Sequence, residues 1–363
     1  MLSILIGHSY FLRLDRKQSA LAKPYPPLAT LQVAALLRRA GHEVALFDAM
    51  LAEDTQEFGT KMSHVRPQVV LFYEDNFNFL TKMCLGAMRE AACQMIAHAH
   101  RAGARVIVAS SDATDAPEPY LRAGADVVLR GEGLRALSAL LARLETDPAA
   151  DRASLITAVS GTIALVNGHL LEGEQVTTAS DATASLASPK GDKTIVVIRP
   201  EGSDLAFKEA PLEAPAAWDL VDIERYRAVW HRGRRVFSLN MAASKGCSFR
   251  CAWCAKPIWG NRYQQRSANA VAAEMIHLKR AFDPGHIWFA DDIFGFRAEW
   301  VNRFAEALEA SGGGVPFTIQ IRADLISEAM AQALHRAGCR EAWIGAESGS
   351  QRVLDAMNKG TTV

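Results

Sequence analysis

The first 140 residues alternate short runs of aliphatic and β-branched residues with longer stretches in which apolar residues recur at helical spacing. Short apolar runs of this kind are typical of buried strands, and their alternation with helical patterns is typical of βαβ units. The pattern therefore predicts an α/β fold that begins with a doubly wound, Rossmann-like parallel sheet. The expected strands are LSILIG, EVALFDA, VVLFY, RVIVASS and DVVLRGEG, and the expected helices are ATLQVAALLRRAG and a long helix from Met83 to Ala102.

The same alternation returns after Arg235, where four further strand-and-helix units follow one another. Four such units predict part of a (β/α) barrel. A complete barrel takes about 250 residues, so we expect only its N-terminal half, with an unpaired last strand, as in a fragment of a longer protein. The expected strands are VFSLNMAAS, HIWFADDIF, FTIQIRADL and EAWIGAES, and the expected helices cover 268–281, 300–310 and 328–337.

The stretch between these halves is rich in Ala, Ser, Thr, Asp and Pro, and it has no sustained period. One part, GTIALVNGHLLEG, predicts a hairpin, because its Asn-Gly pair suits a tight turn. We therefore expect a Rossmann-like domain over residues 1–145, a linker with a hairpin over 146–234, and a partial barrel over 235–363.

Charge and hydropathy exclude some classes of protein. Forty basic residues balance forty acidic ones, so no net charge favours nucleic acid or an anionic membrane as a partner. No apolar run approaches the roughly 18 residues that span a bilayer, and the N-terminus is a poor signal peptide. A cytoplasmic location is expected, in which Cys84, Cys93 and Cys339 are reduced and buried.

The segment GCSFRCAWC carries the chain's most specific chemistry. It places Cys247, Cys251 and Cys254 within eight positions, directly after a predicted strand. Three thiols so close together are typical of metal ligands. Four-iron iron-sulfur clusters that only transfer electrons normally have four cysteine ligands. A cluster with three cysteine ligands would leave one iron open for another ligand. A structural zinc site is the alternative, but it needs four ligands, and His231 and His277 do not supply a pair at finger spacing.

This C-x3-C-x2-C spacing, with the aromatic residue Trp253 before the third cysteine, resembles the signature of the radical S-adenosylmethionine (radical SAM) family. The resemblance implies a 4Fe-4S cluster on the three cysteines, with SAM bound at the open iron. Electron transfer from a donor such as flavodoxin or ferredoxin would then cleave SAM to a 5′-deoxyadenosyl radical. The protein itself would bind, orient and shield the reactants, which include a small-molecule substrate.

Several polar residues follow the later strands. The resemblance implies that they contact SAM: Asp291 and Asp292 its amino group, Arg322 its carboxylate, and Glu347 and Ser348 its ribose. Structural roles are the alternatives, since an aspartate can cap a helix and an arginine can form an ion pair.

The N-terminal domain also resembles a known module. Its segments PYPPLATLQVAALLRRAGHEVALFDA and ASSDATDAPEPYLRAGADVVLRGEG are similar to the cobalamin-binding domain that precedes the radical core in this superfamily. Ligands of doubly wound sheets lie at the carboxyl ends of strands, and the loop YEDNFNFLTKMC contains no histidine that could bind cobalt. A Rossmann-like fold without cofactor is the alternative. The expected cobalamin-binding residues are Tyr25, Pro27, Leu28, Tyr73, Asn76, Ser110, Ser111, Gly131, Glu132 and Gly133.

Together these resemblances imply a cobalamin-dependent radical SAM methyltransferase. One alternative is a radical SAM cyclase or rearrangement enzyme related to the anaerobic porphyrin-ester cyclases, and another is a non-catalytic cobalamin sensor. A nucleic-acid modifying enzyme is disfavoured, because no RNA-binding module and no positive net charge are present. The residues do not identify the substrate.

Overall fold

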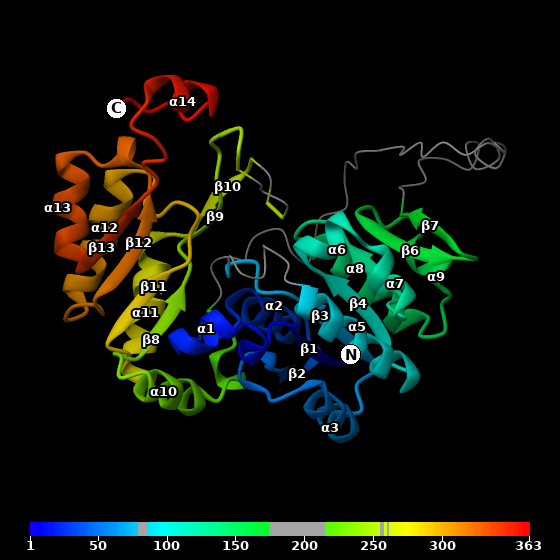
Figure 1. Cartoon of the computed structure of the whole chain (residues 1–363). Helices are drawn as coiled ribbons and strands as arrows, with labels where there is room; N and C mark the ends of the chain where they lie inside the picture. Colours follow the sequence, from blue (N-terminus) through cyan, green and yellow to red (C-terminus); the bar gives the residue numbers. More distant parts are fainter. Residues whose placement is uncertain (79–85, 174–214, 255–257, 260) are drawn as a thin grey trace.

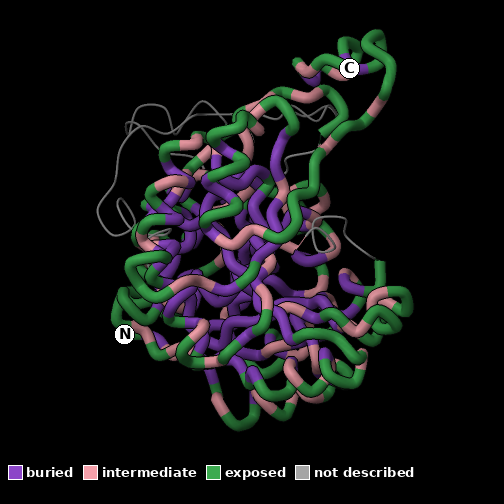
Figure 2. The backbone as a smooth tube through the Cα atoms, turned by 90° about the vertical axis from the view of Figure 1, so that its left-hand side faces the viewer, coloured by how far each residue is buried: buried purple, intermediate pink, exposed green. Residues whose placement is uncertain are grey.

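The computed structural model describes residues 1–78, 86–173, 215–254, 258–259 and 261–363. Two sheets stand on opposite sides of the view in Figure 1, each with helices packed along it. The buried part of the chain runs through the middle of the molecule, as the purple tube in Figure 2 shows.

The first sheet has seven strands in the order β2-β1-β3-β4-β5-β6-β7. Strands β1 to β5 are parallel, in the 2-1-3-4-5 order of a doubly wound fold. The predicted Rossmann-like sheet is thus present. The strand bounds are β1 (Ser3–Gly7), β2 (Glu43–Phe47), β3 (Val69–Tyr73), β4 (Arg105–Ala109), β5 (Val127–Leu129), β6 (Thr162–Val166) and β7 (His169–Glu172).

Side chains that alternate along these strands fill two separate cores. Ile4 and Ile6 of β1 belong to one cluster, whereas Leu5 between them belongs to the other. Both faces of the sheet are therefore buried, which explains why its strands are continuous apolar runs. The helices of this half are α1 (Arg16–Leu21), α2 (Leu28–Arg39), α3 (Thr55–Val65), α5 (Gly86–Arg101), α6 (Ser111–Asp115), α7 (Glu118–Arg122), α8 (Leu134–Thr146) and α9 (Arg152–Ile156), with 3-10 turns η1 (Leu12–Leu14) and η2 (Ala49–Leu51).

The predicted Asn-Gly hairpin is confirmed, but it is not part of a linker. Asn167 and Gly168 both have positive φ, as a tight hairpin turn requires. Strand β6 pairs antiparallel with β5, so the hairpin extends the first sheet beyond residue 145. The linker prediction was wrong here, because a local pattern reveals the hairpin but not the strand with which it pairs. The predicted start of the long helix at Met83 lies outside the described residues.

The second sheet is parallel, in the order β13-β12-β11-β8, as the four βα units predict. Strand β13 forms one edge, and most of its residues are exposed. The strands are β8 (Ser238–Met241), β11 (His286–Phe289), β12 (Phe317–Ile321) and β13 (Cys339–Ile344), and a separate hairpin joins β9 (Ser244–Gly246) to β10 (Tyr263–Gln265). The helices are α10 (Ile223–Arg232), α11 (Ala268–Phe282), α12 (Ala298–Ala310), α13 (Glu328–Ala337) and α14 (Gln351–Ala356), with η3 (Trp218–Leu220) and η4 (Ala323–Leu325).

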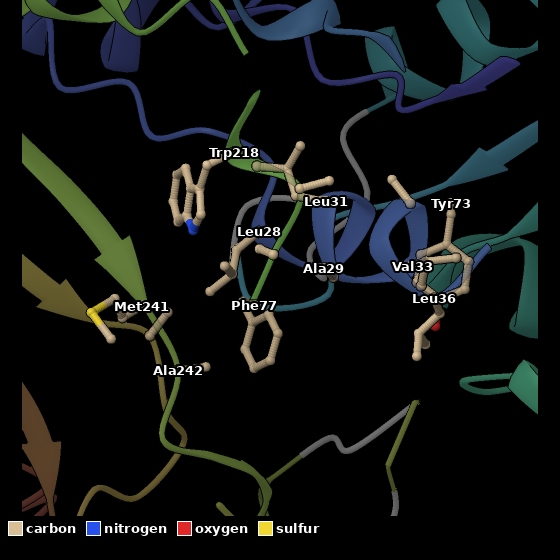
Figure 3. Packing of buried hydrophobic residues seen from close by; sticks show 14 of the residues in the cluster. Leu28, Ala29, Leu31, Val33, Leu36, Tyr73, Phe77, Trp218, Met241 and Ala242 are labelled. Carbon is tan, nitrogen blue, oxygen red and sulfur yellow. The ribbon is translucent and has the colours of Figure 1, made fainter. Parts of the chain in front are cut away.

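One apolar cluster runs from the first sheet into the second half. Figure 3 shows Leu28 and Phe77 of the first half lying toward Met241 and Ala242 of the second. Trp230 of α10 adds a polar contact, because its indole N–H donates to the Pro24 carbonyl at 2.8 Å. The two halves therefore share a continuous core. None of the described helices is long and apolar enough to cross a membrane.

Candidate functional site

The cysteine loop begins where hairpin β9–β10 turns. Gly246 ends β9 with a φ of +73°, and a Cβ at this position would lie 2.3 Å from the Arg262 carbonyl oxygen. Only glycine fits this place, which lets the chain leave the hairpin at Cys247. The sequence placed the loop directly after the strand VFSLNMAAS. That detail was wrong, because β8 ends at Met241 and the three-residue strand β9 intervenes.

The cysteine side chains are accessible and reduced. Cys247 and Cys251 are partly buried and Cys254 is exposed, and no described cysteine forms a disulfide. As the side chains lie, no three His, Cys, Asp or Glu residues of the described part form a metal-binding group. The donor set nonetheless fits an iron-sulfur cluster in its chemistry, because three thiols stand on one short loop and thiolates are the usual ligands of such clusters.

The end of the chain packs against this loop. The backbone N–H of Ala252 donates to the Met357 carbonyl at 2.8 Å, and the Asn358 side-chain amide donates to the Arg250 carbonyl at 3.0 Å. The sequence did not predict these contacts, which join segments about a hundred residues apart. They leave the loop anchored at its centre.

Arg322, directly after β12, approaches one of the three cysteines. Its Nη1 lies 3.7 Å from the Sγ of Cys251. Its Nε and Nη2 both bind the Asp324 carboxylate at 2.9 Å, and Nη2 also donates to the Lys359 carbonyl at 2.6 Å. The guanidinium lies 3.7 Å above the ring centre of Phe249. Arg322 thus lies beside the cysteine loop, and each of its three guanidinium nitrogens already has a contact within the protein.

Asp291 lies behind the hairpin rather than in an open cleft. It is fully buried, it accepts hydrogen bonds from the Ala243 N–H, and its Oδ1 lies 2.5 Å from the Ser244 hydroxyl. Burial raises the pKa of Asp291 to about 7, although these hydrogen bonds act to lower it. The structure therefore shows Asp291 fixing the start of β9. Its neighbour Asp292 is exposed.

The remaining residues expected near SAM lie on more exposed backbone. Trp253 is 55% exposed, so its ring is not part of the core. Glu347 has a φ of +62° and forms an ion pair with the buried Lys359 at 2.9 Å. The Ser348 hydroxyl accepts from the Ser350 N–H at 3.1 Å. These polar groups already have local partners.

Two residues expected to bind cobalamin come together at the carboxyl end of the first sheet. The Tyr73 hydroxyl donates to the Glu132 carbonyl at 2.9 Å, and burial raises the pKa of Tyr73 well above its ordinary value. The Glu132 carboxylate turns toward the second half and pairs with Lys245 of β9 at 2.6 Å. Gly131 also faces that half, since a Cβ there would lie 3.1 Å from the Ile258 carbonyl oxygen. Gly133 has a positive φ and caps α8.

The other expected cobalamin residues are buried or partly buried. The Ser110 hydroxyl accepts from the Ala113 N–H and caps α6, and Ser111 is buried beside it. Asn76 is also buried. The Tyr25 hydroxyl lies 3.3 Å from the Ser238 hydroxyl of β8, and burial raises the pKa of Tyr25 to about 12. Pro27 and Leu28 are buried with it, so this segment packs between the two halves.

Sequence reasoning missed a buried polar network at the end of β1. The ring Nε2 of His8 lies 3.0 Å from Asp48, and the Tyr226 hydroxyl of α10 donates to the same carboxylate at 2.7 Å. Burial lowers the pKa of His8, but the hydrogen bond to Asp48 and the charges of Asp48, Glu74 and Asp75 together raise it more, so the net change is upward. The position of His8 directly after a predicted strand is the signal that could have indicated it.

Lys245 was missed as well. It precedes the Gly-Cys pair, but nothing local in the sequence relates it to Glu132, 113 residues away. Asp324 could have been found, since it follows Arg322 by two positions in IRADL.

The fold and the cysteine loop define a class of protein. Residues 241–363 match the family model of the radical SAM superfamily. This part of the chain contains every cysteine of the loop together with Arg322.

The similarity extends beyond these residues. Over nearly all of its length, 99%, the chain superposes on the cobalamin-dependent SAM radical enzyme OxsB, solved with aqua-cobalamin and SAM bound, with a TM-score of 0.72 and 18% identity. At that identity the similarity shows the fold. The chain therefore shares the α/β fold of OxsB over most of its length, with a Rossmann-like sheet followed by the part that matches the radical SAM family model.

Two curated relatives are similar in sequence. The hopanoid C-3 methylase of Methylococcus capsulatus is 25% identical over 308 residues, which cover 83% of this chain and 48% of the relative. The anaerobic magnesium-protoporphyrin IX monomethyl ester cyclase of Rubrivivax gelatinosus is 28% identical over 211 residues, covering 55% of this chain and 37% of the relative. The chain spans 46% of OxsB, so it matches about half, or less, of each of these proteins.

Proposed function

We propose that this chain is the cofactor-binding part of a cobalamin-dependent radical SAM methyltransferase. One observation carries the proposal: a loop of three reduced thiols, within the residues that match the radical SAM family model, lies next to the carboxyl end of a doubly wound sheet. The ion pair between Lys245 and Glu132 joins the two places directly. The hopanoid C-3 methylase relative supports methyl transfer.

In this proposal the three cysteines hold a 4Fe-4S cluster, and the first sheet holds cobalamin near Tyr73 and the segment 131–133. When bound, the cluster would supply the electron that cleaves SAM, and cobalamin would carry a methyl group. The chain's own residues bind and position them. Asp291 fixes the hairpin from which the cysteine loop starts, and the Lys245–Glu132 pair fixes that hairpin against the first sheet. Electrons would come from a donor such as flavodoxin or ferredoxin.

Anaerobic reconstitution with iron, sulfide and hydroxocobalamin tests the proposal. We expect four irons and one corrinoid per chain, and both 5′-deoxyadenosine and S-adenosylhomocysteine on incubation with SAM, a substrate and a strong reductant. A protein that binds neither iron nor corrinoid contradicts the proposal. Because the chain spans about half of its relatives, cofactor content is the primary readout and product formation the second.

A second candidate function is a radical SAM cyclase, which the similarity to the magnesium-protoporphyrin ester cyclase favours. It predicts 5′-deoxyadenosine without S-adenosylhomocysteine. The ratio of these two products therefore separates the two candidates.

A further inference from the structure

Arg322 combines burial, a fixed orientation and contact with one of the three cysteines. Its side chain is only 7% exposed. Because arginine is rarely buried without a partner, such burial requires groups that bind its charge. Its partners are the Asp324 carboxylate, the Lys359 carbonyl and the face of the Phe249 ring, which approach from three different segments. Together they determine the direction of the guanidinium plane.

The one arm of the fork that does not bind oxygen is the arm that faces sulfur. Nη1 lies 3.7 Å from the Cys251 Sγ, within the range of a hydrogen bond to sulfur, whereas Nε and Nη2 bind oxygens. A guanidinium has a rigid plane, so anchoring two of its nitrogens fixes the third. The structure therefore presents one charged donor to one ligand sulfur.

We propose that Arg322 sets the reduction potential of the cluster held by Cys247, Cys251 and Cys254, with Asp324 as the charge that opposes it. This inference rests on the proposed function and goes beyond it. Hydrogen bonds to the sulfurs and the local charge both control the potential of iron-sulfur clusters. Reduction adds negative charge to the cluster, so a nearby guanidinium stabilises the reduced form and raises the potential. A nearby carboxylate acts in the opposite direction.

Two substitutions test this inference through their opposite signs. Arg322→Gln removes the positive charge, and we expect the midpoint potential of the SAM-free cluster to fall. The expected shift is about tenfold in the reduction equilibrium, or about 59 mV for a one-electron couple. Asp324→Asn removes the opposing charge while Lys359 and Phe249 still hold the arginine, and we expect the potential to rise. EPR-monitored potentiometry on the anaerobically reconstituted full chain measures both.

Arg336→Gln is the matched control. Arg336 also forms an ion pair, with Glu309 at 2.9 Å, but both side chains are about half exposed and lie on α13 and α12. We expect the midpoint potential of the cluster in Arg336→Gln to equal that of the wild type. Should Arg322→Gln lose its iron, Asp324→Asn decides alone, and an unchanged or lower potential in that variant overturns the inference.

SAM affinity separates the inference from the ligand role that the family resemblance implies for Arg322. If Arg322→Gln weakens SAM binding and leaves the potential of the SAM-free cluster unchanged, Arg322 serves the SAM carboxylate and the inference is wrong. A wild-type protein without iron contradicts both this inference and the proposed function. If the wild-type protein holds a cluster and both variants have the same midpoint potential as the wild type, this inference alone is contradicted.

Discussion

Two regions of the chain, the strand ends of the first sheet and the cysteine loop that follows β9, bear side chains of different kinds. At the first sheet, His8 and Glu74 are buried, and their neighbours Asp48 and Tyr226 bind within the same network. In the cysteine loop, Cys254 and the adjacent Trp253 are exposed. Buried polar groups are usually hydrogen-bonded, because leaving them unpaired has a large desolvation cost, and the bonds of His8 and Tyr226 to Asp48 give this network a structural role. Cys254 is exposed and Cys247 and Cys251 are only partly buried, so packing does not account for the three cysteines, and we explain them by their chemistry.

Burial thus separates the network around His8 from the cysteines of the loop. The second half has a framework of its own, in which Arg266 pairs with Glu274 and the Trp218 indole donates to the same carboxylate at 3.3 Å. Substitutions in the framework are expected to change stability, and substitutions in the cysteine loop are expected to change metal content. The following predictions test that division, starting with the largest effect.

Glu274→Ala is expected to lower the free energy of unfolding by about 3–5 kcal/mol, because it leaves the arginine charge buried without its partner. The side chains of Arg266 and Glu274 are 1% and 3% exposed. Denaturant unfolding followed by circular dichroism measures the loss. Glu309→Ala, which breaks the exposed pair with Arg336, is the control and should change the free energy of unfolding little, because solvent screens this pair. Equal losses in the two variants would contradict the assignment of Arg266–Glu274 to the framework.

Asp291 is expected to make stability depend on pH. Its pKa is about 7 in the folded chain, against an ordinary value of 3.8. A raised folded-state pKa means that the folded state holds the proton more tightly, so its contribution is complete below about pH 4 and is lost as the pH rises to about 7. The full difference corresponds to up to about 4 kcal/mol. Denaturant unfolding curves between about pH 4 and pH 7 measure this pH dependence of the free energy of unfolding, which Asp291→Asn should lose. The same pH dependence in the variant and the wild type would contradict the prediction.

The Lys245–Glu132 pair is expected to couple the halves by about 0.5–3 kcal/mol. Lys245 is 8% exposed and Glu132 is 28% exposed, so solvent screens the pair only in part. A double-mutant cycle of Lys245→Met and Glu132→Gln isolates this coupling in the free energy of unfolding. Strictly additive effects would show that the contact does not join the two halves energetically.

Much of this fold follows from local patterns. The strands of both sheets are confirmed because buried parallel strands are continuous apolar runs, and the turn at Asn167–Gly168 is confirmed because few residue pairs adopt its positive φ values. Strand β9 was not predicted, since it is three residues long and its partner β10 follows only after the cysteine loop. Short strands leave no period to recognise.

The candidate site divides in the same way. Cys247, Cys251 and Cys254 were found because their spacing alone is specific. The network around His8 and the contact between Lys245 and Glu132 were not, because they join residues 40 or more positions apart. Tyr25 was predicted to bind cobalamin, and nothing in the sequence indicated that its hydroxyl lies 3.3 Å from the Ser238 hydroxyl of β8. Only the packing of the two halves decides such roles, and local sequence does not encode it.

The iron content of cysteine variants tests the central claim most directly. Cys247→Ala, Cys251→Ala and Cys254→Ala, each reconstituted anaerobically, should lose most of the four irons expected per chain and the associated visible absorbance. Cys93→Ala and Cys339→Ala, which remove thiols outside the loop, should keep them. If a loop variant retained the full iron content, or if the two control variants lost it equally, the cysteine loop would not be the cluster site.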